Sequence, residues 1–394
     1  MKRWFLIVSC ALLCAALMAG CRRLYPDESL SVKEHNAPFA FRETTAAPTE
    51  TADPPMLTAS NYYELRSVLR SFVSDGVEHG EVFVRSYSGN LEDDLKKLIR
   101  YLTEEDPVSA YATDYVSCER MSMDGGWMVS VNAVYRRSVG EIREIQPVRG
   151  SEEALSRMLD ALRRQENSVT LQVSGYSDGN FAAQLRQYIL YHPDEVIAEP
   201  QINVSVYPDA GLVRVVEVHF VYPEDRETLR GMRTEAEAVL DSAFHYIDYG
   251  RTDQQKLRLL FTYLTTRFSY REDENASVYS LLCGGVGSSR TAASVVRLLC
   301  EKTGVAATLV EGTREGKTWY WNIVSTADGF RHVDLHADAL SGGPLTFRTD
   351  SEMAEYTWER AACPVCAEPQ PEEESGTEET VSESETTAET GENN

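Results

Sequence analysis

The 394-residue chain has few basic residues for its size. It contains 38 lysines and arginines against 62 aspartates and glutamates, which gives a formal net charge of -24 at pH 7. A surface of this charge repels the phosphate backbone of DNA and RNA, so the composition excludes nucleic acid as a partner. The length and a hydrophobic share of 42% suffice for two or three domains with a sizeable core.

The chain also lacks an apolar run of full membrane-spanning length at its start. The run "WFLIVSCALLCAALMAG" follows Lys2 and Arg3, covers only 17 residues and ends in small residues. This pattern is typical of a secretory signal rather than of a transmembrane helix, and we expect residues 1–20 to be that signal. The "LMAGC" that follows resembles the lipobox of bacterial lipoproteins, with Met18 where leucine is usual. The resemblance implies a diacylated Cys21 that anchors the protein at the outer face of a bacterial cell membrane.

Two further stretches have too few apolar residues to form a core. Residues 21–56 are rich in Pro, Thr, Ala and Glu, and we expect a flexible stalk. Residues 367–394 contain ten glutamates and no lysine or arginine, and we expect an acidic disordered tail.

Between these ends, two segments of similar pattern, 57–145 and 146–245, predict a repeated small α+β module. Each begins with an amphipathic stretch, "NYYELRSVLRSFVSDG" or "SEEALSRMLDALRRQEN". A strand-like run, a second helix-like run and one or two alternating runs follow, so the expected order is αβαββ. Neither copy contains a cluster of catalytic residue types, and His219 is expected to be a satisfied surface or interface side chain.

A glycine-rich turn, "GGVGSS", runs into a predicted helix near residue 289 but lacks two features of phosphate-binding turns. A P-loop requires a lysine directly before the serine, and this turn has none. A dinucleotide fingerprint requires a third glycine where Arg290 stands. We therefore expect no nucleotide cofactor, and the sequence gives no motif for any other cofactor.

Before the turn, Thr252 and Gln255 form a predicted capping box at the start of an amphipathic helix.

We expect a third domain at residues 246–366, and within it residues from about 252 to 360 resemble the transglutaminase-like core, the papain-related fold of many bacterial proteins. The resemblance rests on "GVGSSRTAASVVRLLCEKTGVAATLVEG", on "WYWNIV" and on "DGFRHVDLHAD". In that family a Cys opens the helix after the turn, a His leads a "HAWN"-like strand, and an Asp ends a "VD" strand. These three positions fall on Ser288, Trp319 and Asp334 here, so only the acid is kept. An indole has no basic nitrogen, and a serine without a base is a poor nucleophile.

Other residues offer replacements for the lost pair. Cys283 lies five positions before Ser288, and His332 lies two before Asp334, which allows a relocated Ser288–His332–Asp334 set. The simpler interpretation is that Ser288 caps the helix.

The two tryptophans of "WYWNIV" have two possible roles. Trp319 and Trp321 alternate on one strand, so they either pack one face of a sheet or form a platform for a ligand. The C-x-x-C of Cys363 and Cys366 is weak as a zinc motif, because structural zinc takes four ligands, and we expect no metal. We expect instead a disulfide from one of these two residues to another cysteine.

The sequence predicts an α+β protein in which two modules precede a transglutaminase-like domain. The expected function is a binding or scaffold role at the cell envelope, with a peptide, a surface protein or peptidoglycan as partner. The alternative is a cysteine- or serine-dependent peptidase or transglutaminase with a relocated triad, acting on envelope proteins or peptidoglycan.

Overall fold

The computed structural model describes residues 56–177 and 179–368. The predicted signal segment, Cys21, the predicted stalk up to residue 55 and the acidic tail from residue 369 lie outside this range. None of the helices within it combines the length and the apolar character needed to cross a membrane.

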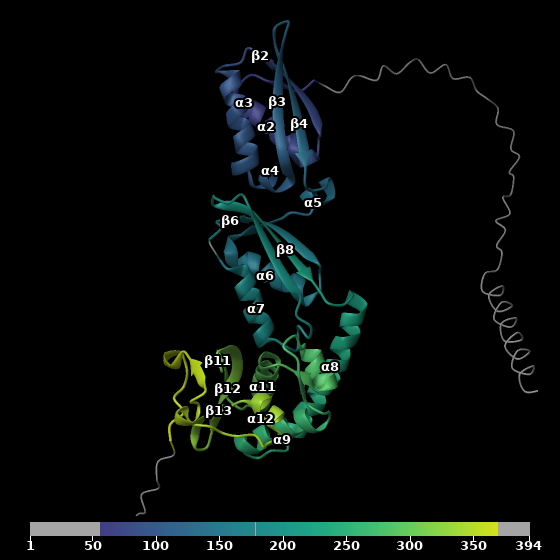
Figure 1. Ribbon diagram of the computed structural model, residues 1–394. Helices are drawn as coiled ribbons and strands as arrows, with labels where there is room; N and C mark the ends of the chain where they lie inside the picture. Colours follow the sequence, from purple (N-terminus) through teal and green to yellow (C-terminus); the bar gives the residue numbers. More distant parts are fainter. Residues whose placement is uncertain (1–55, 178, 369–394) are drawn as a thin grey trace, which may run out of the picture. The chain divides into compact units, whose positions relative to one another are not determined.

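The described chain is a mixed α+β structure (Figure 1), as the sequence predicts. Its α-helices are α2 (Tyr62–Asp75), α3 (Leu91–Arg100), α4 (Pro107–Ala112), α5 (Val139–Arg143), α6 (Gly150–Arg163), α7 (Phe181–Tyr191), α8 (Arg226–Ile247), α9 (Asp253–Thr266), α10 (Val278–Gly284), α11 (Ser289–Thr303) and α12 (Leu335–Ser341). Its strands are β1 (Thr58–Ala59), β2 (His79–Arg85), β3 (Thr113–Met123), β4 (Gly126–Tyr135), β5 (Gln146–Arg149), β6 (Ser168–Ser174), β7 (Gln201–Tyr207), β8 (Val213–Val221), β9 (Arg271–Glu272), β10 (Val286–Gly287), β11 (Ala307–Arg314), β12 (Lys317–Thr326), β13 (Gly329–Val333) and β14 (Tyr356–Trp358). Short helical turns are η1 (Tyr101–Glu105), η2 (Asp350–Glu352) and η3 (Arg360–Ala362).

Two successive segments have the same strand order and the same pairing. The order is β1-β2-β4-β3 in the first sheet and β5-β6-β8-β7 in the second. In both, the first pair is parallel and the other two are antiparallel. The sequence predicts αβαββ, whereas each segment begins with one further short strand. Strands of two and four residues are too short to show an alternating pattern, which is why they were missed.

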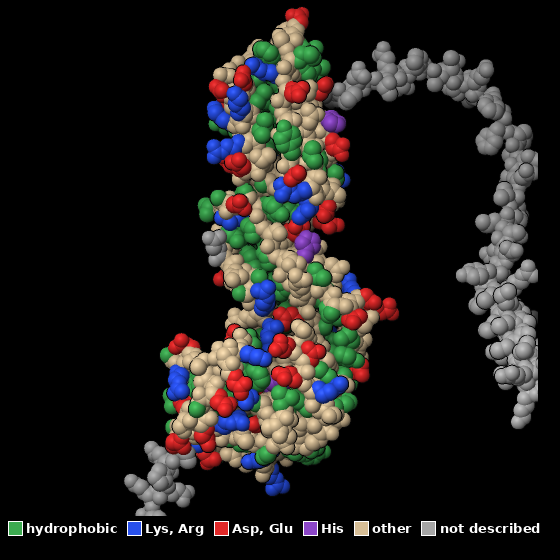
Figure 2. Space-filling model, in the orientation of Figure 1, with side chains coloured by type: hydrophobic (Ala, Val, Ile, Leu, Met, Phe, Trp, Pro, Cys, Tyr) green, Lys and Arg blue, Asp and Glu red, His purple; other side chains and the backbone are tan. Residues whose placement is uncertain are grey.

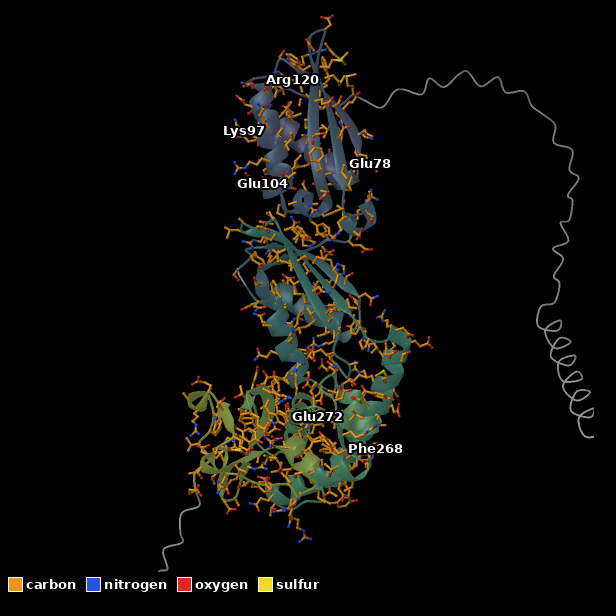
Figure 3. All side chains as sticks on the ribbon, in the orientation of Figure 1. Glu78, Lys97, Glu104, Arg120, Phe268 and Glu272 are labelled. Carbon is orange, nitrogen blue, oxygen red and sulfur yellow. The ribbon has the colours of Figure 1, made fainter. Side chains whose placement is uncertain are left out.

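Each of these sheets has its own apolar core, formed with its own helices. Leu65, Leu69 and Leu98 of α2 and α3 pack with β2 and β4, while Met158 and Leu185 of α6 and α7 pack with β6 and β8. On the face drawn in Figure 2, acidic and basic side chains are interspersed. Figure 3 labels Arg120, which pairs with Glu92 at 2.7 Å.

The second sheet meets the first segment through a buried carboxylate. Glu217 of β8 is 3% exposed and accepts hydrogen bonds from Tyr111 at 3.1 Å and Arg137 at 2.6 Å. His219, on the same face of β8, lies 3.2 Å from it through Nε2, so this histidine has a partner as expected.

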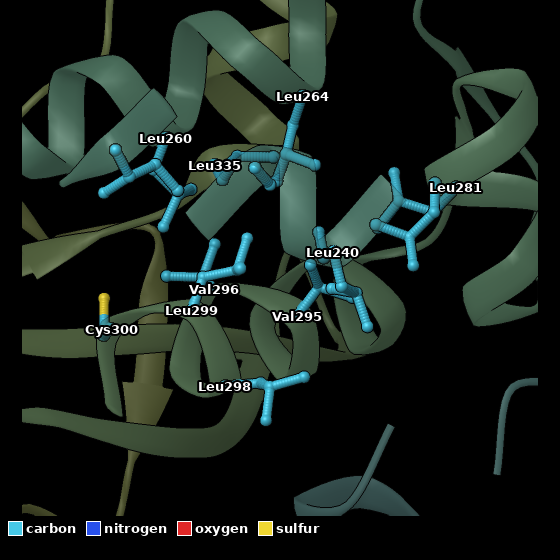
Figure 4. Packing of buried hydrophobic residues seen from close by; sticks show 14 of the residues in the cluster. Leu240, Leu260, Leu264, Leu281, Val295, Val296, Leu298, Leu299, Cys300 and Leu335 are labelled. Atoms are coloured by element: carbon cyan, nitrogen blue, oxygen red, sulfur yellow. The ribbon is translucent and has the colours of Figure 1, made fainter. Parts of the chain in front are cut away.

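The C-terminal sheet, in the order β13-β12-β11-β14, separates two apolar clusters. One face packs on α11, whose Val295, Val296 and Leu299 join α8, α9 and α10 in the largest core (Figure 4). Asn322 of β12 ties the two layers together by donating to the Ala293 carbonyl at 3.0 Å. The other face carries Trp321 and is covered by the chain that follows α12, including Met353 and Tyr356.

Helix α9 forms where the sequence predicts it. Thr252 is its N-cap and accepts from the Gln255 backbone N–H at 3.2 Å, and Leu257, Leu260 and Leu264 face the core. The Gln255 side chain accepts from Arg251 rather than closing the predicted capping box.

Candidate functional site

The glycine turn before α11 has a conformation that side chains would prevent. Gly285 ends α10 with a left-handed φ of 67°. A Cβ on Gly287 would lie 2.7 Å from the Tyr270 hydroxyl oxygen and 2.9 Å from Leu281, closer than real contacts allow. Strand β10 pairs in parallel with β9, which sets Gly287 opposite Glu272. The turn therefore places Tyr270 and Glu272 beside the start of α11.

Ser288 is the N-cap of α11. Its Oγ accepts from the Thr291 backbone N–H at 3.2 Å, and its own N–H donates to Thr291 Oγ1 at 2.9 Å. These bonds form a reciprocal capping box. Among the described residues no histidine or carboxylate is hydrogen-bonded to Ser288, so nothing here takes up its proton.

Asp334 is a buried carboxylate that accepts three hydrogen bonds. It is 1% exposed; Trp319 Nε1 donates to Oδ2 at 2.7 Å, Tyr356 donates to the same oxygen at 2.8 Å, and the Ala337 N–H donates to Oδ1 at 2.9 Å. The last bond makes Asp334 the N-cap of α12. Trp319 thus occupies the place of a base toward this acid, but it can only donate.

A histidine that sequence reasoning did not single out lies beside this pair. His336 of α12 is 1% exposed, and its ring centroid lies 5.2 Å from that of Trp319. Its Nδ1 is 2.7 Å from the Tyr270 hydroxyl and its Nε2 is 3.4 Å from Glu272. Burial lowers the pKa of His336 and raises that of Tyr270, so both are neutral at pH 7. Sixty-six positions separate Tyr270 from His336, and no local pattern signals their contact.

His332 is not placed to act as the base of a Ser288–His332–Asp334 set, the alternative that the sequence allows beside a capping role for Ser288. Its Nδ1 accepts from Trp321 Nε1 at 2.9 Å, and its Nε2 lies 2.8 Å from Asp350. Both ring nitrogens are therefore occupied. Strand β13 ends at Val333, so Asp334 turns into α12 and no longer follows the alternation that would align it with His332.

The two tryptophans of β12 do not form the ligand platform that the sequence allows. Trp321 is 1% exposed and packs edge-on against Tyr356 and Trp358, so it offers no surface to a ligand. Trp319 is half-buried, with the Arg314 guanidinium 5.3 Å from its ring. It binds Asp334 and does not line the pocket described below.

The predicted disulfide is wrong for this structure, in which all five cysteines of the described chain are free thiols. Cys118 and Cys300 lie in different cores from Cys363 and Cys366. Cys283 of α10 is half-buried, and burial and Glu235 raise the pKa of its thiol, which disfavours the reactive thiolate form.

Three side chains on the outer face of the C-terminal sheet have donor atoms suited to a metal ion. The donor atoms of His332, Asp350 and Cys366 all lie within 4.8 Å of one another. Trp321 can only donate, so its bond to Nδ1 places the imidazole proton on Nε2, directed at Asp350. A metal would need that nitrogen deprotonated. Burial also raises the pKa of Cys366 to about 12, so its thiol keeps its proton. His332 and Asp350 therefore fit a hydrogen-bonded pair beside a protonated thiol better than a metal site.

A pocket of about 620 Å³ opens in front of Ser288. Its walls come from the end of α7 and the loop after it, from α8, from the loop between β9 and α10, and from the start of α11. Ser288, Arg290, Thr291 and Ser294 belong to its lining. Ser288, the position expected to hold the nucleophile, therefore borders a cavity of a size suited to a small ligand or peptide side chains.

Comparison with known proteins finds no matching family model and no matching curated protein. Three solved structures are similar to the chain. A TGase has 7% identity and a TM-score of 0.23, with 60% of this chain and 68% of that chain covered. A candidate cysteine protease from Cytophaga hutchinsonii has 9% identity and a TM-score of 0.23, with 40% and 70% covered. A candidate protease from Parabacteroides distasonis has 5% identity and a TM-score of 0.21, with 54% and 47% covered.

Proposed function

We propose that the chain is a lipoprotein, anchored through Cys21 at the outer face of a bacterial membrane, that binds a peptide or another cell-envelope component without transforming it. In this proposal the region from residue 246 to 366 keeps a transglutaminase-like frame and has lost its reaction. The ligand occupies the pocket in front of Ser288.

The observation that carries the proposal is the set of hydrogen bonds made by the Ser288 hydroxyl and the Asp334 carboxylate. The serine hydroxyl closes a capping box, and the carboxylate accepts an indole N–H, a phenol and a backbone N–H. Nucleophilic catalysis requires a base within hydrogen-bond reach of the nucleophile and an acid that orients the base. The acid is present, but its partner Trp319 cannot accept a proton.

Blocking the pocket tests the binding function. Ala276 lines it from an exposed loop, so Ala276→Trp should fill it without disturbing a core. Ala327→Trp, in the exposed turn between β12 and β13, is the matched control. We expect the purified protein to retain peptides or peptidoglycan fragments in a pull-down, the Ala276→Trp variant to lose them, and the control to keep them. Equal retention by both variants contradicts the proposal.

A second candidate function, hydrolysis or acyl transfer, is favoured by His336 alone. This histidine lies between Tyr270 and Glu272 and next to the turn that ends at Ser288. Both of its nitrogens are occupied and its ring is buried, which argues against a role as base. Turnover of a peptide or glutamine substrate that disappears in His336→Ala, with the fold intact, would establish this second function in place of the first.

A further inference from the structure

We propose that the pocket in front of Ser288 selects a primary ammonium group on an aliphatic stem, as in a lysine side chain of a peptide. This inference rests on the proposed binding function and adds the chemical class of the ligand. It comes from the distribution of charged and apolar side chains around the cavity.

Acidic side chains dominate the charged groups of the pocket. Four carboxylates line it: Glu199 before β7, Glu224 before α8, and Asp273 and Glu274 after β9. The only basic residue in the lining is Arg290, which is paired with Glu199. On the face drawn in Figure 2, by contrast, acidic and basic side chains are interspersed. The four carboxylates and the single guanidinium leave three net negative charges, which attract a cation and repel an anion.

The three carboxylates other than Glu199 are weakly engaged. Glu224 has no ion-pair partner within the described ranges, and Asp273 accepts only the backbone N–H of Asn275, at 2.9 Å. Glu274 lies 4.0 Å from Lys317, and both side chains are more than 70% exposed. Such an exposed pair contributes little, so a ligand cation can replace the lysine at small cost.

The deeper part of the pocket is apolar. Buried or half-buried aliphatic side chains from three helices, one loop and strand β10 line it: Ile189, Leu190, Val196, Ile197, Met232, Val278 and Val286. These surfaces suit methylene groups rather than a charge, and each buried methylene strengthens binding by about fourfold. The acidic groups lie where the pocket meets solvent, because Glu224, Asp273 and Glu274 are all exposed.

Helix α11 fixes the direction in which such a ligand lies. Its N-terminus, which carries a partial positive charge, borders the pocket at Ser288. An ammonium group is therefore disfavoured beside Ser288 and favoured at the rim near Glu224 and Glu274. A lysine-like side chain meets both conditions when its stem covers the apolar floor and its nitrogen lies at the rim.

Fluorescence anisotropy with a pair of short labelled peptides tests the inference. The peptides have the same sequence, with one central lysine that is either free or Nε-acetylated, so that only the charge differs. We expect the free-lysine peptide to bind the soluble ectodomain at least about fivefold more tightly, and the preference to shrink as salt is raised from 50 to 500 mM.

Two matched double variants test whether the preference for free lysine depends on the carboxylates at the rim of the pocket. Glu224→Gln with Glu274→Gln removes two charges from the rim, and Glu78→Gln with Glu104→Gln removes two from the first module (Figure 3), outside the pocket. We expect the rim variant to lose the preference for free lysine and the control to keep it. Equal affinity for the two peptides, or equal loss in both variants, overturns the lysine inference and leaves the binding function in place. Failure of both peptides to bind also overturns the lysine inference, whereas the binding function is decided separately by the pull-down with the Ala276→Trp variant.

Discussion

Two tryptophans on β12, two residues apart, each donate an indole N–H into an acidic cluster, but they do so differently. Trp319 donates directly to the carboxylate of Asp334. Trp321 donates to His332, which in turn contacts Asp350. The first cluster has an acid and no base, and the second has a base whose two nitrogens are both occupied. Residue types known from catalytic sites therefore do not make a catalytic site merely by lying near one another. General-base catalysis also requires a side-chain atom that is free to accept a proton.

The largest expected difference between the two clusters is in stability. Trp321 is fully buried, so Trp321→Ala should lower the free energy of unfolding by about 3–5 kcal/mol. Trp319 is half-buried, and Trp319→Ala should cost about half as much. Urea unfolding followed by circular dichroism measures both. A larger loss at Trp319 would mean that the cluster around Asp334 supports the fold more than its burial suggests.

The two acids, Asp334 and Asp350, should also differ in how much each contributes to the free energy of unfolding. Asp334 is 1% exposed and accepts three hydrogen bonds, so Asp334→Asn leaves a buried donor unsatisfied and should cost about 2 kcal/mol. Asp350 is 26% exposed in its side chain, and Asp350→Asn should cost about 1 kcal/mol or less. The same unfolding experiment compares them, and equal losses would contradict the difference in burial.

The buried histidines predict a dependence of stability on pH. Burial lowers the pKa of both His332 and His336 in the folded chain below the unfolded value of 6.5. Between the two values the unfolded chain binds more protons than the folded one. Stability from these residues is therefore complete above pH 6.5 and is lost as the pH falls toward the folded pKa, by at most about 1.4 kcal/mol per pH unit for each histidine.

A variant that lacks one of these histidines separates its contribution to the pH dependence of stability from that of the other titrating groups. His332→Gln should flatten the fall in unfolding free energy between pH 7.5 and 5.5 relative to the parent chain. A parallel curve for the variant would show that His332 is not buried as a neutral ring.

The smallest expected change in stability follows from substitution of Ser288. As an N-cap, Ser288→Ala should destabilise the chain by about 1 kcal/mol, whereas Ser288→Asn, which retains a capping oxygen, should cost less. Thermal unfolding at fixed pH separates the two. If both variants match the parent chain, the capping box does not stabilise α11.

Local features of the fold could be predicted from the sequence, because they depend on neighbouring residues. The helix α9 with its Thr252 cap and the turn into α11 follow from spacing and capping chemistry. The site was predicted only in part. Trp319 and Asp334 were identified, but the sequence does not indicate that one binds the other.

The remaining features depend on contacts between distant positions. Tyr270 meets His336 across 66 positions, and Glu199 reaches the pocket from the loop before β7. The partners of Cys366 follow from the path of the chain after α12, which carries no periodic pattern. Tertiary packing creates proximity of this kind, so spacing along the chain does not reveal that His332 pairs with Trp321 and Asp350.

Chemical labelling of Ser288 distinguishes a capping serine from an activated nucleophile. The purified protein is incubated with a fluorophosphonate, which reacts with activated serines, and the modified residue is identified by mass spectrometry. A capping serine without a base should remain unmodified, at the level of the Ser288→Ala variant. Stoichiometric labelling of Ser288 that is lost in His336→Ala would show that the chain has an active nucleophile and would contradict the account.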